Sequence, residues 1–286
     1  MKLGSIELQP LSDGWFGLDG GAMFGVVPRV LWEKRNPPDE RNRIRLALRP
    51  LLIVTGPETI LVDTGIGRKY GDRFNDMFNV DQSSDDLLTS LARTGRRPED
   101  VTQVVLTHLH FDHAGGATRL DENGRPVPTF SNARHFVQQT EWEDANNPNR
   151  RTRGSYRPDD FLPLDAAGLI KKVDGNTDIA PGIRLLRTGG HTRGHQVVLV
   201  RSEDHTAIYW ADLIPTASHV PIPYIMGYDT YPLETIRGKE ELLARAADGE
   251  WISIFEHDPD LDVALIVRDG DGFRARSIER PLPTKE

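Results

Sequence analysis

The sequence contains no cysteine in 286 residues. This absence excludes disulfide bonds, and it also excludes thiolate ligands for a metal ion. Any metal centre in this protein must therefore be built from histidine and carboxylate side chains. The chain has 9 histidines and 43 aspartates and glutamates from which to build one.

An excess of basic residues and long apolar runs are also missing. The 35 lysines and arginines are outnumbered by acidic residues, and the formal net charge is −8. Because nucleic-acid binding needs a basic face, no nucleic-acid partner is expected. No apolar stretch is long enough to cross a membrane, and residues 1–7 carry no apolar leader. We therefore expect a soluble, cytoplasmic protein with no membrane partner.

What the chain does have is a dense group of histidines in residues 104–116, Val-Val-Leu-Thr-His-Leu-His-Phe-Asp-His-Ala-Gly-Gly. The apolar start predicts a buried strand. Residues two apart on a strand share a face, so His108 and His110 should project together. Asp112 and His113 then lie in the turn into a helix, facing the same hollow, and the two final glycines let the backbone pass close to a bound group. Three imidazoles and a carboxylate within six residues suit a metal such as Zn²⁺.

Other polar residues also stand at the ends of predicted strands, one of which is expected to run unbroken over residues 44–55. Asp63 is placed where a carboxylate could orient a metal-bound histidine through its second ring nitrogen. His191, in a glycine-rich stretch, is predicted as a ligand, and His195 is predicted to make a structural hydrogen bond. Asp212 could bridge two metals. Strand ends that converge on one sheet edge are typical of a sandwich with helices outside.

Three apolar segments are predicted to surround this site. Residues 15–28 are punctuated by glycine and are interpreted as a loop, residues 66–82 as an excursion over the pocket, and residues 214–228 as a proline-rich loop. The expected pocket wall consists of Met23, Phe24, Val26, Phe74, Phe78, Ile222, Tyr224, Met226 and Tyr228. Three arginines within residues 150–153 are interpreted as a solvated face.

The order of these motifs resembles the metallo-β-lactamase superfamily. The resemblance runs from about residue 40 to residue 260 and rests on Val-Asp-Thr-Gly at 62–65, His-x-His-x-Asp-His at 108–113, Gly-His at 190–191, Asp212 and His257. It implies an α/β fold, a four-layered αβ/βα sandwich, in a single domain over residues 1–286 with its site at one edge.

The resemblance also implies a cofactor of two divalent metal ions, with Zn expected and Fe, Mn or Co as alternatives. One ion would be held by His108, His110 and His191. The other would be held by Asp112, His113 and His257, and Asp212 would bridge the two.

Within the superfamily, the chain looks most like the acyl-homoserine-lactonase and organophosphate-hydrolase-like branch. This implies a hydrolase of lactones or esters with an apolar portion, with side activity on phosphotriesters. A metal-bridging hydroxide would attack the carbonyl, and Asp112 would pass a proton to the leaving alkoxide. The alternatives are a glyoxalase II-like thioester hydrolase, a mononuclear iron persulfide dioxygenase, and a non-enzymatic metal-binding member. The oligomeric state is open, and a homodimer is compatible with the sequence.

One position departs from the lactonase pattern. Many lactonases of this superfamily carry a tyrosine three residues after the bridging aspartate, where this chain has Pro215, which has no hydrogen-bond donor. His219, Tyr224 and Tyr228 are candidate replacement donors to the substrate carbonyl. We favour His219, because it is the nearest of the three to Asp212 in sequence and a neutral imidazole donates one hydrogen bond.

Overall fold

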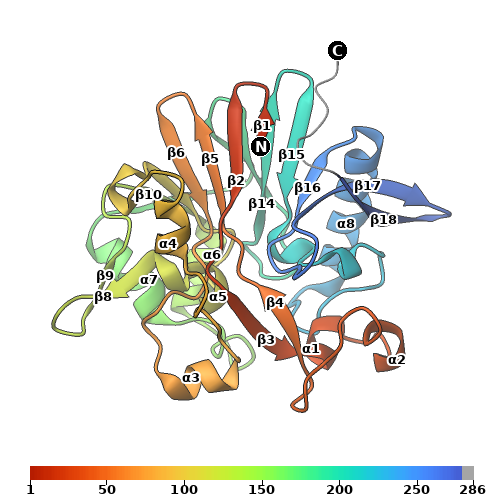
Figure 1. Ribbon diagram of the computed structural model, residues 1–286, viewed down its shortest axis with the longest axis horizontal. Helices are drawn as coiled ribbons and strands as arrows, with labels where there is room; N and C mark the ends of the chain where they lie inside the picture. The colour runs from red at the N-terminus through yellow and green to blue at the C-terminus, as the bar shows by residue number, and fades with distance from the viewer. Residues whose placement is uncertain (279–286) are drawn as a thin grey trace.

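Two large β-sheets packed face to face form the centre of the molecule in the computed structural model, which describes residues 1–278 (Figure 1). The first sheet has the strand order β1-β2-β5-β6-β7-β10-β11. These strands span Lys2–Leu3, Ile6–Pro10, Leu51–Thr55, Glu58–Val62, Gln103–Val105, Arg134–Gln138 and Ile170–Val173. Strands β6, β7, β10 and β11 are parallel. Because parallel strands are buried on both faces, β7 and the residue after it supply the apolar run at residues 104–106, shortly before the histidine motif.

The second sheet follows the chain order, β12-β13-β14-β15-β16-β17-β18. Its strands span Thr177–Ala180, Ile183–Arg187, Gln196–Ser202, His205–Tyr209, Ile252–Ile254, Val263–Asp269 and Gly272–Ser277. All neighbours are antiparallel except β15 and β16, which helix α8 (Pro232–Asp248) connects across one face.

Helices cover the two outer faces (Figure 1). On the first sheet lie α4 (Leu87–Ala92), α6 (Gln139–Asn146) and α7 (Pro158–Ala166), and on the second lies α8 (Pro232–Asp248). One apolar core lies between the sheets, and one more lies between each sheet and its helices. The fold is therefore the expected α/β sandwich of four layers.

A two-stranded ribbon at one end of the sandwich corrects two of the sequence predictions. Residues 15–28 are not a plain loop: they form β3 (Trp15–Asp19), α1 (Gly20–Phe24) and the approach to α2 (Arg29–Trp32). The predicted strand 44–55 is in fact two strands, β4 (Arg43–Ala47), which pairs with β3, and β5, which belongs to the first sheet. The chain changes partner between them at Pro50, which has no N–H for a ladder hydrogen bond.

The ribbon and its neighbours enclose a fourth apolar cluster beside the histidine motif. It joins Phe16, Met23, Ile44 and Met226 to Phe111, the residue between His110 and Asp112. Other short elements are α3 (Asp72–Met77), α5 (Phe111–Ala114), β8 (Thr118–Leu120) and β9 (Pro126–Pro128), together with several 3₁₀ turns. Among the described residues, no helix is both long and apolar enough to cross a membrane.

Candidate metal centre

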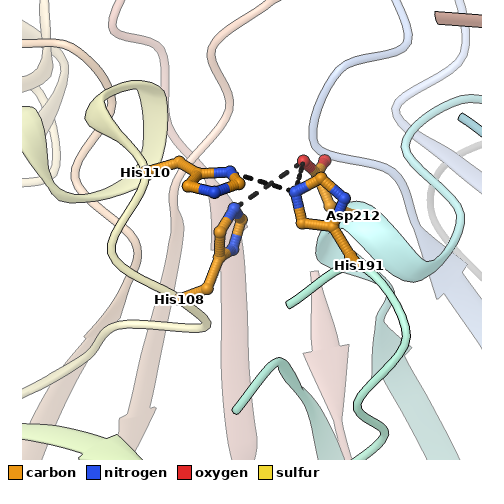
Figure 2. A group of neighbouring side chains, drawn as sticks. All are labelled: His108, His110, His191 and Asp212. Atoms are coloured by element: carbon orange, nitrogen blue, oxygen red, sulfur yellow. Dashed lines mark hydrogen bonds and ion pairs between the residues drawn. The ribbon is translucent and has the colours of Figure 1, made fainter. Parts of the chain in front are cut away.

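The predicted ligands come from segments far apart in the sequence and meet where the strands of both sheets end. His108 and His110 follow β7, and His191 follows β13. Asp212 lies in a single 3₁₀ turn, Ala211–Leu213, after β15, and His257 lies just after β16. Figure 2 shows His108 and His110 facing His191 and Asp212 across the junction between the sheets.

The first group of side chains is His108, His110, His191 and Asp212, whose potential ligand atoms all lie within 4.8 Å of one another. His110 Nδ1 is 3.0 Å from His191 Nε2. Asp212 Oδ2 is 3.1 Å from His191 Nε2 and 3.7 Å from His108 Nε2. The four side chains are buried and converge on one point.

A second group, Asp112, His113 and His257, lies on the other side of Asp212. The Nε2 atoms of His113 and His257 are 3.2 Å apart, and Asp112 Oδ2 lies 3.7 and 3.8 Å from them. Asp212 Oδ1 is 3.3 Å from His257 Nε2, and its Oδ2 is 3.4 Å from His113 Nε2. A single carboxylate thus faces both groups.

The hydrogen bonds of the imidazoles leave ligand nitrogens directed inward. The outer nitrogens are occupied: His108 Nδ1 is 3.1 Å from Thr107 Oγ1, His191 Nδ1 is 2.9 Å from Asp229 Oδ1, and His257 Nδ1 is 2.8 Å from the Ala47 carbonyl. His108 Nε2 and Asp212 Oδ1 are buried without a hydrogen-bond partner among the described residues. Buried polar atoms without partners are uncommon, and metal ions would satisfy them. The donor set therefore fits two divalent cations.

The electrostatics of the centre point the same way. Burial and the neighbouring imidazoles hold the pKa values of His108 and His110 well below their ordinary range, in the neutral form that binds metals. For His257, burial opposes protonation, but the adjacent Asp212 carboxylate and the charge of Glu256 outweigh it and raise the pKa to about 9. The carboxylates that raise this pKa supply negative charge, and two bound cations would neutralise it.

Asp63 and His195 lie where the sequence placed them, directly behind the centre. Asp63 Oδ2 is 3.0 Å from His113 Nδ1, and its carboxylate also accepts hydrogen bonds from the backbone and side chain of Thr107. Asp63 has a φ of 55°, a left-handed conformation that costs a non-glycine residue free energy and is often found at functional sites. His195 accepts from the Asp212 amide at 3.2 Å and contacts Thr188 Oγ1 at 2.7 Å.

Two supporting carboxylates were not predicted from the sequence. Asp229 contacts the outer nitrogen of His191, as described above, and Glu256 Oε2 lies 2.9 Å from His113 Nδ1. Glu256 directly precedes the predicted ligand His257, so its place in the sequence could have identified it as a supporting carboxylate. Asp229 is 38 residues from its partner, and no local pattern links the two.

The glycines that end the motif serve a purpose other than the predicted one. A Cβ on Gly116 would collide with the Thr64 carbonyl, and one on Gly115 with the Ile66 carbonyl. They therefore make room for the loop that follows Asp63, not for a bound group.

A cavity of about 340 Å³ opens over the centre. Five of its lining residues are candidate ligands: His110, Asp112, His191, Asp212 and His257. One part of the wall is apolar or aromatic, with Leu18, Met23, Phe78, Phe111, Met226 and Tyr228. The rest is formed by Arg151, Thr152, Gly154, Ser155, Gly227 and Thr230. The volume and mixed lining are those of a small-molecule site.

The predicted pocket wall is only partly correct. Met23, Phe78, Met226 and Tyr228 line the cavity, but the other five residues do not. Phe24 is fully buried and stacks on Trp32, and Val26 is 90% exposed. Phe74 packs behind Phe78 and Phe111. Ile222 packs against the core under α8, and Tyr224 stands edge-on to Phe24.

The expectation that His219 donates to a substrate carbonyl is wrong. Its Nε2 is 2.8 Å from the Met23 carbonyl, its Nδ1 is 2.8 Å from Thr216 Oγ1, and its ring stacks on Phe24. The imidazole is buried and does not line the cavity. Its position near Asp212 in sequence did not reveal that it belongs to the packing beneath the pocket.

Arg151 is exposed, as the prediction of a solvated face implies, but it also lines the cavity, which the sequence did not indicate. Its Nη2 donates to the carbonyls of Gly227 at 2.6 Å and Asp229 at 3.1 Å. Arg150 and Arg153 are likewise exposed, and neither lines the cavity.

Comparison with known proteins decides the family. Residues 50–270, more than half of the chain, match the model of the metallo-beta-lactamase superfamily. The chain belongs to the metallo-β-lactamase superfamily.

Among members of this superfamily, an N-acyl homoserine lactonase of Bacillus cereus is 34% identical over 172 residues. That match covers 57% of this chain and 61% of the relative, so the chain spans about three fifths of the relative's length.

Two solved structures resemble the whole chain. A probable metal-dependent hydrolase from Staphylococcus aureus has a TM-score of 0.88 and 34% identity, covering 98% of this chain and 100% of that one. AidC, a dizinc quorum-quenching lactonase in complex with a product, has a TM-score of 0.80 and 25% identity, covering 98% and 96%.

Proposed function

We propose that this protein is a lactonase that binds two divalent metal ions and hydrolyses lactones carrying an apolar acyl portion, of the N-acyl homoserine lactone type. The observation that carries the proposal is the position of Asp212. One carboxylate faces two separate groups of ligand atoms, at the floor of a cavity with an apolar wall. The lactonase relatives support the choice of substrate class.

The ligand groups assign the residues that would hold each ion. His108, His110 and His191 would hold one, Asp112, His113 and His257 the other, and Asp212 both. When bound, such a pair supplies an activated water near neutral pH and polarises the lactone carbonyl.

The protein's own residues then orient the ligands and handle the proton. Asp229, Thr107 and the Ala47 carbonyl fix the outer nitrogens of three histidines, which sets the ring orientation and the tautomer. The Asp112 carboxylate lines the cavity floor. In the proposed reaction it accepts the proton of the attacking water and returns it to the leaving alkoxide, so the lactone opens to a hydroxy acid.

The apolar wall accounts for the preference for an acyl tail. Met23, Phe78 and Met226 line the cavity next to the candidate ligands, and Phe111 is part of the histidine motif itself. Each buried CH₂ group contributes about 0.8 kcal/mol, so successive methylenes should tighten binding until the wall ends.

The experiment is a substrate series on purified, metal-reconstituted protein. Acid release should be measured for N-acyl homoserine lactones of increasing tail length, with an aryl ester, a phosphotriester and a glutathione thioester as the other arms. We expect lactones to give the highest kcat/KM, rising with tail length. Fully metallated protein that prefers the thioester would favour the glyoxalase II-like alternative, and a flat dependence on tail length would contradict the role of the apolar wall.

A further inference from the structure

A short segment after α6 brings polar groups into the cavity. Arg151, Thr152 and Ser155 line it together with the candidate ligands. The segment is held in place: Asn149 Oδ1 accepts from the amides of Arg151 and Thr152, and the Ser155 carbonyl accepts from the Phe111 amide at 3.1 Å. The polar wall is thus attached directly to the histidine motif.

The Arg151 guanidinium is only partly used by the protein. Its Nη2 donates to the Gly227 and Asp229 carbonyls, which ties the segment to the loop that carries Tyr228. Within residues 1–278, no carboxylate pairs with Arg151, and its Nε and Nη1 make no hydrogen bond. By contrast, Arg193 forms ion pairs with both Glu143 and Asp144. A guanidinium has five N–H donors, so Arg151 retains donors for a ligand in the cavity.

The free N–H donors of the Arg151 guanidinium cannot form hydrogen bonds with a purely hydrocarbon tail. A hydrocarbon tail would pack on the apolar wall, and the metal centre would polarise the lactone carbonyl. Thr152 and Ser155 line the same wall, and their hydroxyls make no hydrogen bond to another residue within 1–278, which adds two more donors. Together these groups match an oxygen acceptor, because arginine binds carbonyl and carboxylate oxygens through charge-assisted hydrogen bonds.

We infer that Arg151 is a specificity-determining residue, which binds an oxygen acceptor carried by the substrate outside the lactone ring while the tail lies on the apolar wall. The acceptor is an amide carbonyl next to the ring or a carboxylate farther along the tail. This inference rests on the proposed lactonase function and adds a requirement to it: the substrate carries a second, polar handle.

The test uses three lactones with tails of similar length. The first is a plain alkyl γ-lactone without another acceptor, the second is N-hexanoyl homoserine lactone with its amide, and the third is an alkyl γ-lactone whose tail ends in a carboxylate. The variants are Arg151→Met and, as a matched control from the same segment, Arg153→Met, whose side chain is exposed and outside the cavity wall.

We expect Arg151→Met to lower kcat/KM about tenfold or more on the acceptor-bearing lactone that the site uses. The change should be mainly in KM, because loss of a hydrogen bond to a charged group weakens binding by about this factor. The plain lactone should change by less than about twofold, and Arg153→Met should change none of the three. A loss confined to the amide lactone identifies the carbonyl as the acceptor, and a loss confined to the third lactone identifies the carboxylate.

Equal losses on all three lactones would overturn the inference, because they would show that Arg151 acts only by anchoring the Gly227 and Asp229 loop. Unchanged kcat/KM on all three lactones would also overturn the inference.

A binding measurement separates this inference from the proposed function. Calorimetry compares the ring-opened products, N-hexanoyl homoserine and an alkyl hydroxy acid of equal length, on metallated wild-type and Arg151→Met protein. If wild-type protein hydrolyses no lactone, the proposed function fails. A third product, a hydroxy acid of equal length whose tail ends in a second carboxylate, covers the other acceptor. The inference still stands if Arg151→Met weakens binding of the amide product or of this third product but not of the alkyl hydroxy acid, and it falls if all three products bind the two proteins alike.

Discussion

At the scale of single residues, the proposed two-metal centre depends most on Asp212. Its Oδ2 lies near His191 of the first group and His113 of the second, and its Oδ1 lies near His257. Asp63 is also buried, but its carboxylate contacts the outer nitrogen of His113 and accepts hydrogen bonds from Thr107. Asp212 thus faces the ligand nitrogens of both groups, whereas Asp63 faces His113 from the outer side of its ring, where Asp63, His113 and Glu256 form a third group of potential ligands.

Replacing each aspartate with alanine tests this difference. We expect Asp212→Ala to lose metal from both positions and nearly all activity. Asp63→Ala should lose about 10–100-fold in metal affinity or activity, as is typical for a residue that orients a ligand. Metal content by elemental analysis and kcat/KM on the best lactone check the ranking. Equal losses with equal metal content would refute it.

Tyr228 is the remaining candidate for the donor that Pro215 cannot provide. Its side chain lines the cavity, whereas Tyr224 does not. Burial, with the charges of Asp19 and Asp112, raises the pKa of Tyr228 above its ordinary range, so its hydroxyl keeps its proton at neutral and moderately alkaline pH.

We predict that Tyr228→Phe lowers kcat by about tenfold or more, with unchanged metal content, because loss of one donor to a developing oxyanion costs about 10²–10³ where the donor is essential. Tyr224→Phe is the matched control and should keep wild-type kcat. If the two variants behave alike, the metal ions are the only electrophile.

At the scale of elements, β10 contains a buried histidine that has no part in the centre. His135 lies between β7 and β11, and its Nδ1 is 3.1 Å from the Ala133 carbonyl. Its Nε2 has no hydrogen-bond partner among residues 1–278. Burial lowers the pKa of His135 to about 4, so the folded protein keeps this imidazole neutral.

A stability measurement against pH follows from this. In the unfolded chain the imidazole titrates near pH 6.5, so between pH 6.5 and 4 the unfolded state binds more protons and the free energy of unfolding falls. Wild-type protein should therefore lose about 2 kcal/mol more than His135→Leu as the pH drops from 6.5 to 4.5. Urea unfolding at pH 6.5 and 4.5 gives the comparison. Parallel losses in both proteins would show that His135 does not contribute to acid sensitivity.

The elements also show where sequence reasoning succeeded and where it stopped. Apolar runs that end in histidine or aspartate located β7, β15 and the residues after them, because strand periodicity and strand ends are local properties. The break at Pro50 was missed, because an apolar run does not show that its two halves pair with different sheets. Phe24 and Val26 were placed in the pocket from composition alone, although the direction of a side chain depends on packing.

At the scale of the whole molecule, the centre depends on both sheets. The first sheet positions the ligands within residues 108–113, and the second sheet positions His191, Asp212 and His257. The ligands therefore assemble only when the two sheets pack together. The order of the motifs predicted this assembly through a family resemblance, and the family is now established. The contacts of Asp229, Glu256, Arg151 and His219 were beyond reach, because each depends on a partner distant in sequence.

The central claim is that one chain holds two divalent ions around Asp212. The most direct measurement is the metal content of purified protein after saturation with Zn²⁺ and removal of unbound metal, by elemental analysis against protein concentration. We expect two ions per chain in the wild-type protein. A saturated chain that retains no more than one ion would contradict it.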